Sequence, residues 1–172
     1  MASDAAEEGG IGTGGYLYLL GDSDGWHSRA RSAGRFPVAF EGYWQQRDVY
    51  IAQYELSIVL VAVLCEDSKL RNRRGIWFID NIAALMALVR GTSNNPDLNM
   101  LAAMIHAALF ALQVWVYFEW VESEANWADG VSREGRNCQW SKDHGFAVQG
   151  IVFTHRVLML PVYPMMRLAQ FL

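Results

Sequence analysis

The middle of the sequence alternates two apolar strands with two helices, in an order that restricts the fold. Residues 76–79 form a short continuous apolar run, as expected of a strand buried on both faces of a parallel sheet. Residues 82–90 and 97–112 are predicted to be helices, and residues 114–121 are rich in β-branched and aromatic side chains, which favour a strand. The order strand, helix, helix, strand predicts a right-handed crossover between parallel strands, and therefore an α/β fold.

The first 44 residues predict shorter strands separated by turns. Residues 1–15 carry five glycines and are predicted to be a turn region, whereas residues 16–20 are predicted to be a strand. The glycines and aspartates at residues 21–25 predict a turn, and a polar, arginine-bearing stretch follows at residues 26–35. A further strand is expected at residues 38–44. The segment at residues 22–35, which lies between the two predicted strands, is longer than a simple hairpin needs.

A carboxylate lies in the apolar stripe of a helix predicted at residues 48–64. Asp48 is placed to cap the first turn by accepting hydrogen bonds from its free amides. Ile51, Glu55 and Ile58 share one face at helical spacing, and the opposite face is also apolar, so the helix is expected to be largely buried. A carboxylate in such a stripe costs free energy unless something pairs with it, which makes Glu55 a candidate functional residue.

The composition is that of one globular domain. A length of 172 residues, with 52% hydrophobic and 19% charged residues, allows a single core and argues against disorder. The net charge of −4 gives no global basic field for nucleic acid, although divalent ions at a carboxylate cluster would offset part of it. Cys65 and Cys138 match neither zinc-ligand spacing nor a disulfide framework. Because residues 1–15 are acidic and glycine-rich, we expect no signal peptide and an intracellular protein that is not secreted.

One segment is long and apolar enough to be tested as a membrane span. Residues 98–118 carry no formal charge and approach the length that crosses a bilayer. A small membrane protein, built on this segment and on the apolar stretch at residues 146–172, is therefore one hypothesis. We favour a buried helix that runs into a buried strand, because the second half of the segment is β-branched and aromatic. No membrane partner is expected.

Acidic residues lie at positions where the predicted fold can bring them together. Asp80 ends the first apolar strand, and ligands in α/β sheets bind just beyond the carboxyl ends of strands. Asp129 follows the second strand across a short loop and so returns to the same end of the sheet. Asp4 lies beside the glycine-rich turn, and Glu55 projects from the inward face of its helix. Converging carboxylates stay ionised together only with cations present, and their hard oxygen atoms suit magnesium or manganese.

Four short motifs occur in order along the chain. They are Ser3-Asp4-Ala5, Gln53-Tyr54-Glu55-Leu56, Phe78-Ile79-Asp80-Asn81-Ile82-Ala83-Ala84 and Ala125-Asn126-Trp127-Ala128-Asp129-Gly130-Val131-Ser132-Arg133. The last motif is the most specific, and the order of all four resembles that of the ribonuclease H-like domains of reverse-transcribing elements. The resemblance covers about residues 1–135 and leaves residues 136–172 as a C-terminal extension of unknown structure. It implies a five-stranded mixed sheet of order 3-2-1-4-5 with helices on both faces.

The resemblance also implies a site, an activity and a context. The residues that would hold two magnesium or manganese ions are Asp4, Glu55, Asp80 and Asp129. The implied reaction is hydrolysis of the RNA strand of an RNA–DNA hybrid, which requires contacts to 2′-hydroxyl groups. The candidates for contact with the substrate are Asn81, Ser132 and Arg133. The implied context is a retroelement reverse transcriptase, with a polymerase domain upstream in the same polyprotein.

The chain departs from the family's pattern in ways that leave alternatives open. Only three residues precede Asp4, although the family's first strand is central and starts well before its aspartate. Asp22 and Asp24 are therefore rival candidates for the first carboxylate. Residues 122–128 lack the histidine that some ribonucleases H carry in this loop. The alternative function is a module without catalytic activity that positions nucleic acid or supports a polymerase, and the acidic net charge is consistent with it.

Overall fold

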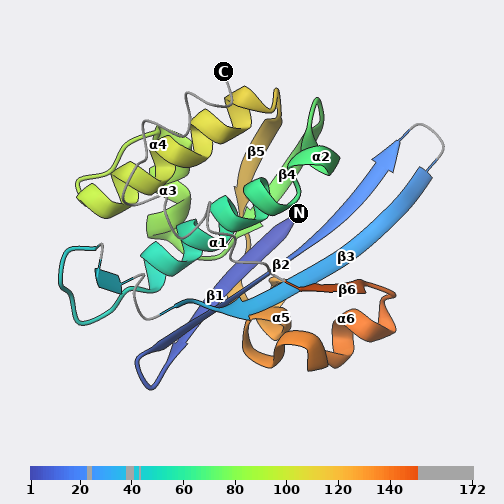
Figure 1. Cartoon of the computed structure of the whole chain (residues 1–172), viewed down its shortest axis with the longest axis horizontal. Helices are drawn as coiled ribbons and strands as arrows, with labels where there is room; N and C mark the ends of the chain where they lie inside the picture. Colours follow the sequence, from blue (N-terminus) through green and yellow to red (C-terminus); the bar gives the residue numbers. More distant parts are fainter. Residues whose placement is uncertain (23–24, 38–40, 43, 151–172) are drawn as a thin grey trace.

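The computed structural model describes residues 1–22, 25–37, 41–42 and 44–150, which form a six-stranded sheet between two layers of helices (Figure 1). The strands are β1 (Ala2–Glu8), β2 (Ile11–Asp22), β3 (Gly25–Arg35), β4 (Arg74–Ile79), β5 (Trp115–Trp120) and β6 (Ala147–Gly150). The helices are α1 (Ile51–Cys65), α2 (Asp67–Leu70), α3 (Ile82–Arg90), α4 (Pro96–Ala111), α5 (Asp129–Glu134) and α6 (Gln139–Asp143), with the 3-10 turns η2 (Ser123–Ala125) and η3 (Gly135–Asn137).

The sheet is mixed, and its strands lie in the order β5-β4-β1-β2-β3-β6. β1 is antiparallel to β2 and parallel to β4, β2 and β3 form a long antiparallel hairpin, and β4 is parallel to β5. The α/β class predicted from the sequence and the strand order 3-2-1-4-5 implied by the resemblance are therefore confirmed. A sixth strand, β6, is added parallel to β3 at the outer edge.

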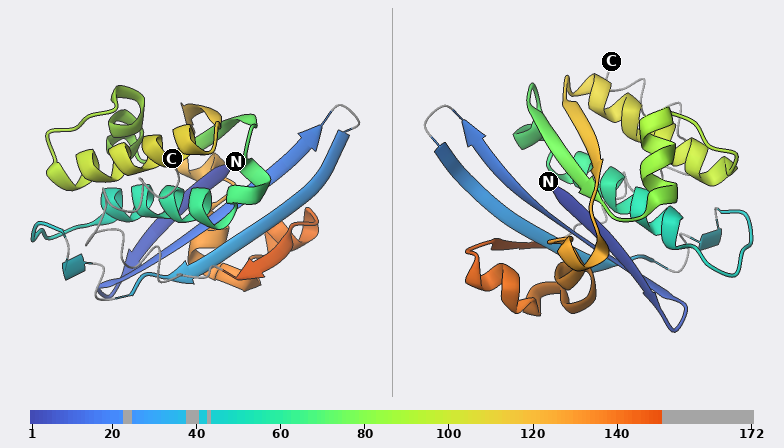
Figure 2. Two further views of the ribbon diagram at one scale, coloured as in Figure 1. Left: turned by 45° about the horizontal axis from the view of Figure 1, so that its top comes forward. Right: turned by 180° about the vertical axis from the view of Figure 1, so that it is seen from behind.

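Helices cover both faces of the sheet, as the resemblance implied (Figure 2). α1, α3 and α4 pack on one face, where Trp77 and Ile79 of β4 belong to the main core. α5 and α6 lie against the other face, where Leu17, Val131 and Phe146 belong to a smaller core. α1 is buried along most of its length, which explains why apolar residues occur on both of its sides.

The crossover between β4 and β5 runs through α3 and α4, as the sequence predicts. Asn81 caps α3 by accepting a hydrogen bond from the Ala84 amide (3.0 Å), and Gly91 ends the helix with a left-handed φ of 67°. Residues 98–118 thus divide between α4 and β5, but β5 is an edge strand with exposed side chains and not the buried strand we expected. In the described part of the chain, no helix combines the length and hydropathy that a bilayer span requires.

The prediction of a turn region at residues 1–15 is wrong, because most of these residues form β1 and the start of β2. Gly9 and Gly10, with φ of 58° and 74°, make the turn between the two strands. Gly15 has a packing role instead, since a Cβ atom there would lie 2.8 Å from the backbone nitrogen of Ser132 in α5. The polar stretch at residues 26–35 also belongs to the sheet, as the strand β3.

The start of α1 differs from the prediction. The residue before the helix, Tyr50, provides no side-chain cap, and the helix begins too late for Asp48 to provide one, so that prediction is wrong. Glu7 at the end of β1 instead accepts a hydrogen bond from the Tyr50 amide (3.2 Å). The first turn of α1 is therefore fixed to the sheet by a long-range contact.

The strand predicted at residues 38–44 is only partly covered by the described residues. Residues 38–40 and 43 lie outside them. Glu41 and Gly42 form a 3-10 turn, so no strand is found at these two positions.

The described part of the C-terminal extension packs against the same sheet. The buried guanidinium of Arg31 in β3 donates to the backbone oxygens of Arg136 (3.1 Å) and Cys138 (3.0 Å). β6 then pairs with β3. Residues 151–172 lie outside the described part, and the division of the chain at residue 135 stays a prediction.

Candidate metal centre

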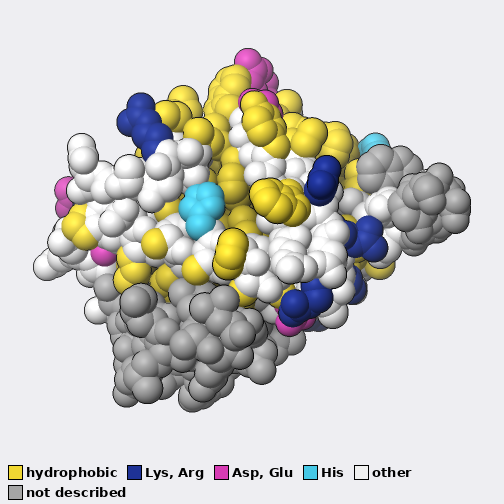
Figure 3. Space-filling model, turned by 90° about the horizontal axis from the view of Figure 1, so that it is seen from above, with side chains coloured by type: hydrophobic (Ala, Val, Ile, Leu, Met, Phe, Trp, Pro, Cys, Tyr) yellow, Lys and Arg dark blue, Asp and Glu magenta, His cyan; other side chains and the backbone are white. Residues whose placement is uncertain are grey.

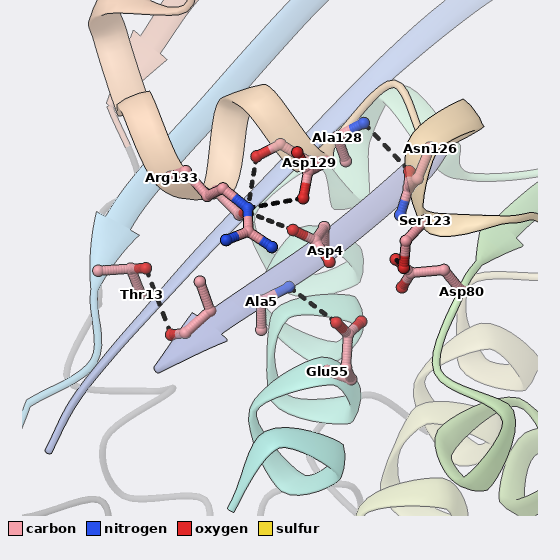
Figure 4. Close-up of polar contacts among 12 residues, drawn as sticks. Asp4, Ala5, Thr13, Glu55, Asp80, Ser123, Asn126, Ala128, Asp129 and Arg133 are labelled. Carbon is pink, nitrogen blue, oxygen red and sulfur yellow. Dashed lines mark hydrogen bonds and ion pairs between the residues drawn. The ribbon is translucent and has the colours of Figure 1, made fainter. Parts of the chain in front are cut away.

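Two neighbouring strands separate where the acidic residues lie. The parallel pairing of β1 with β4 joins Ala2 to Phe78 and extends no further among the described residues, so the strands diverge toward their carboxyl ends. Asp4 on β1 and Asp80 just after β4 flank this opening, and Glu55 points toward it from α1 (Figure 4). The carboxyl ends of strands are the usual place for ligands in α/β sheets.

Three of the four predicted carboxylates come together here. One oxygen from each of Asp4, Glu55 and Asp80, the carboxylate trio, lies within 4.8 Å of the other two. Asp4 and Glu55 are 4% and 2% exposed, and Asp80 is half-buried. Asp129 is not part of the trio but lies in the first turn of α5, close enough for its charge to raise the pKa of Asp4.

Glu55 is the most deeply buried member of the trio. Its Oε1 atom accepts a hydrogen bond from the Ala5 amide (2.8 Å), which fixes α1 to β1. Its other oxygen, Oε2, is buried and accepts no hydrogen bond from any described residue. Burial, followed by the charges of Asp4 and Asp80, raises the pKa of Glu55 well above its usual value. A buried carboxylate oxygen without a donor costs free energy, and a bound cation would remove that cost.

Asp4 is held from the opposite face of the sheet. The hydroxyl group of Ser132 in α5 donates to its Oδ2 atom. Burial raises the pKa of Asp4 to about 6; the Ser132 hydrogen bond opposes this shift, and the charges of Asp80 and Asp129 add to it. Ser132 can reach Asp4 because α5 packs closely on Gly15, the residue of β2 that pairs with Asp4.

The loop after β5 contributes residues that sequence reasoning missed. Ser123 donates to Oδ2 of Asp80 (2.6 Å). Asn126 is buried and joins the loop to β1, since its Nδ2 donates to the Ser3 backbone oxygen (3.1 Å) and its Oδ1 accepts from the Ala128 amide (3.1 Å). Asn126 lies within the most specific motif, so it could have been identified from the sequence. Nothing near Ser123 distinguishes it from an ordinary loop serine.

The last carboxylate is oriented by its own helix. Nε of Arg133 donates to Oδ1 of Asp129 (2.7 Å), four residues earlier, and this bond raises the pKa of Arg133. Both side chains are substantially exposed, so the pair orients Asp129 more than it stabilises the fold. Asn81, a candidate for substrate contact, is already engaged as the cap of α3.

Comparison with solved structures places the fold. The crystal structure of ribonuclease H1 from the halophilic archaeon Halobacterium salinarum NRC-1 matches with a TM-score of 0.54 and 18% identity, over 77% of this chain and 92% of that one. The N-terminal ribonuclease H domain of a Mycobacterium tuberculosis protein matches with a TM-score of 0.52 and 16% identity, over 83% and 94%. The fold is ribonuclease H-like. No protein-family model and no curated protein matches the sequence.

The ribonuclease H-like topology bears on the rival first carboxylates. Asp22 ends β2 at the far tip of the hairpin, seven residues along the strand from Gly15, the partner of Asp4. At the rise of a β-strand this separation is about 23 Å, which removes the Asp22 backbone from the opening between β1 and β4. Asp24 lies outside the described residues. Asp4, in the central strand, is the aspartate that the topology brings to Glu55 and Asp80.

Proposed function

We propose that this chain is a metal-dependent endonuclease that hydrolyses the RNA strand of RNA–DNA hybrids. The observation that carries the proposal is the carboxylate trio, in which two buried acids face a third and one buried oxygen has no donor among the described residues. The ribonuclease H-like fold and the resemblance of the motif that contains Asp129 support the class of reaction.

The residues present fit divalent cations. The trio offers only carboxylate oxygens, the hard ligands that magnesium and manganese prefer. Acids this close and this buried do not ionise together without a compensating positive charge. In our proposal the trio holds one ion, and Asp129 contributes to a second beside it. Ions bound there would lower the pKa of a water molecule and offset the charge that develops on the phosphoryl group.

The protein's own groups keep these carboxylates in place. Each member of the trio accepts one hydrogen bond from elsewhere in the chain, from Ser132, Ser123 or the Ala5 amide. Arg133 directs the carboxylate of Asp129. Because the donors come from three different elements, the carboxylates are held by the fold itself, and little rearrangement is needed when ions bind.

The proposed context is a retroelement reverse transcriptase. Its support is the resemblance of the motif that ends in Asp129-Gly130-Val131-Ser132-Arg133. Sequencing the transcript upstream of this chain tests the proposal, because a polymerase reading frame continuous with it is the expected result. The intracellular location stays a prediction.

A cleavage assay tests the activity. We expect the full chain to cleave the labelled RNA strand of an RNA–DNA hybrid in magnesium and not in EDTA. Asp80→Asn is expected to lower the rate at least about a hundredfold, because it removes a charged ligand. The matched control is Asp143→Asn, an exposed carboxylate on α6, which should leave the rate unchanged. Intact hybrid in the presence of folded wild-type protein would contradict the proposal.

Magnesium titration separates the nuclease from the alternative module without catalytic activity. Ion binding to the folded state alone raises the melting temperature. We expect this rise in the wild-type protein and a smaller one in Asp80→Asn. A rise without hybrid cleavage would favour the inactive module, and no rise at all would show that the trio does not bind the ion.

A further inference from the structure

The edge strand β5 has no strand partner on its outer side among the described residues. The amides of Trp115 and Val121 donate to backbone oxygens on the β4 side. By the alternation of a β-ladder, Val116 and Phe118 therefore direct their N–H and C=O groups away from β4. An edge of this kind is a template for another strand.

The side chains along this edge are apolar and exposed. Val116 and Phe118 pack against the main core, so Trp115 and Tyr117, which are 70% and 65% exposed, lie on the opposite face of the sheet. Ile76 of β4, 50% exposed, continues this surface. Figure 3, viewed from the side where α4 and the start of β5 lie, shows hydrophobic side chains exposed across this part of the molecule.

The helical layer above β5 is exposed and apolar as well. α3 packs over β5, and its Ile82 and Val89 are 62% and 58% exposed. These two residues are seven positions apart and therefore lie on the same side of the helix. Exposed apolar side chains therefore occur both on β5 and on the helix that packs over it.

Charged groups at the two ends of β5 have opposite signs. Arg74 is in register with Trp115 at the start of the strand, and Glu119 lies near its end; both are exposed. Arg74 has no carboxylate within ion-pair distance in the described part of the chain. By strand alternation, Arg74 and Glu119 lie on the same face as Tyr117.

We propose that this chain forms a symmetric dimer in which β5 of two copies pair side by side and antiparallel. With a two-fold axis at Tyr117, the outward N–H and C=O groups of Val116 exchange hydrogen bonds with those of the partner's Phe118. The two-fold symmetry creates the same pair on the other side of the axis. Trp115 then lies opposite the partner's Glu119, and Arg74 is brought toward that same carboxylate. The two sheets become one continuous sheet, and the exposed sides of the two α3 helices face each other.

A second copy matches this edge better than other occupants. A nucleic acid duplex presents phosphates, which Glu119 would repel, and has no strand to satisfy the outward groups of Val116 and Phe118. An acidic peptide would match Arg74 but leave Glu119 without a counter-charge. An antiparallel strand with the opposite charge at each end can pair with both Arg74 and Glu119. A second copy of β5, related by a two-fold axis, is such a strand.

Analytical ultracentrifugation of the full chain tests the dimer. At tens of micromolar protein we expect twice the monomer mass of 19.4 kDa. Tyr117→Lys places two like charges at the axis and is expected to raise the dissociation constant at least about tenfold. The matched control is Val148→Lys, the same kind of change on β6 at the other edge, where the side chain is 48% exposed; it should remain dimeric.

A charge exchange tests the register. Arg74→Glu alone is expected to weaken the dimer, and adding Glu119→Arg should restore it, because the two charges meet across the axis. A wild-type monomer at about 100 μM, a dimer unaffected by Tyr117→Lys, or a dimer equally weakened by Val148→Lys would overturn the proposal. Circular dichroism of each variant confirms that it is folded, and none of these outcomes depends on nuclease activity.

Discussion

Replacing Asp4 by asparagine is expected to stabilise the protein in the absence of divalent ions. Asp4 is 4% exposed, and burial is the largest cause that raises its pKa from 3.8 to about 6. At about 1.4 kcal/mol per pH unit, this shift makes the ionised carboxylate lower the free energy of unfolding by about 3 kcal/mol at neutral pH. Asparagine removes the charge, keeps the shape, and can still accept the hydrogen bond from Ser132.

The stability that Asp4→Asn gains over the wild type increases with pH, because the pKa of Asp4 is raised in the folded state. Below about pH 4 the Asp4 carboxyl group is protonated in both the folded and the unfolded state, so the two proteins should be equally stable. Between pH 4 and about 6 the unfolded state loses its proton first, and the stability of the wild type falls as the pH rises. Above about pH 6 the gap stays at its full value.

Urea denaturation in EDTA, repeated between about pH 4 and pH 8, measures the gap. For a chain of this size, 3 kcal/mol corresponds to a rise in melting temperature of about 6–12 °C. Magnesium should narrow the gap in the free energy of unfolding, because we expect the intact trio to bind the ion more tightly than the variant. Asp143→Asn, an exposed carboxylate, should shift stability by at most about 0.5 kcal/mol. Equal stability at pH 8, or a gap that persists unchanged at pH 4, would refute the reasoning.

Three further substitutions examine the support of the site. Gly15→Ala should lower the free energy of unfolding by at least about 2 kcal/mol in urea titrations, because its Cβ would lie 2.8 Å from the α5 backbone. Asn81→Ala should lower it by about 1 kcal/mol through loss of the α3 cap; a disproportionate fall in hybrid cleavage would instead indicate substrate contact. Arg133→Ala should change stability by less than about 1 kcal/mol, yet raise the magnesium concentration needed for half-maximal cleavage, because Asp129 loses its orienting bond; an unchanged magnesium requirement would contradict that role.

The parts of the fold that followed from the sequence are those with a local signature. The crossover from β4 to β5 was predictable because a continuous apolar run, two helical segments and a β-branched run occur in order. Asp80 and Glu55 could be identified in the same way. Asp80 directly follows an apolar run, and Glu55 interrupts an apolar helical stripe, so each stands out from its immediate neighbours.

The parts that the sequence did not reveal depend on contacts between distant segments. Gly15 lies in a glycine-rich stretch that is typical of a turn. Its missing side chain instead leaves room for α5, which lies more than 100 residues later in the chain. The strand β3 looks polar in the sequence, yet Arg31 is buried there, and its two terminal nitrogens donate hydrogen bonds to backbone oxygens of the C-terminal segment. Neither periodicity nor composition can indicate a buried arginine whose partners are carbonyl groups, because every residue carries one.

The same long-range contacts explain why the site and the second layer of helices belong together. Ser132 donates to Asp4 from the helix that also carries Asp129, so this helix must be packed on Gly15 before the fourth carboxylate can lie beside the trio. Repulsion among the acids opposes that packing when no cation is present, and the hydrogen bond from Ser132 partly offsets it. By linkage, an ion bound among these carboxylates would stabilise the docking of α5, and the docking of α5 would strengthen binding of the ion. The candidate metal centre therefore depends on the packing between α5 and the central strand, and not on the three nearest carboxylates alone.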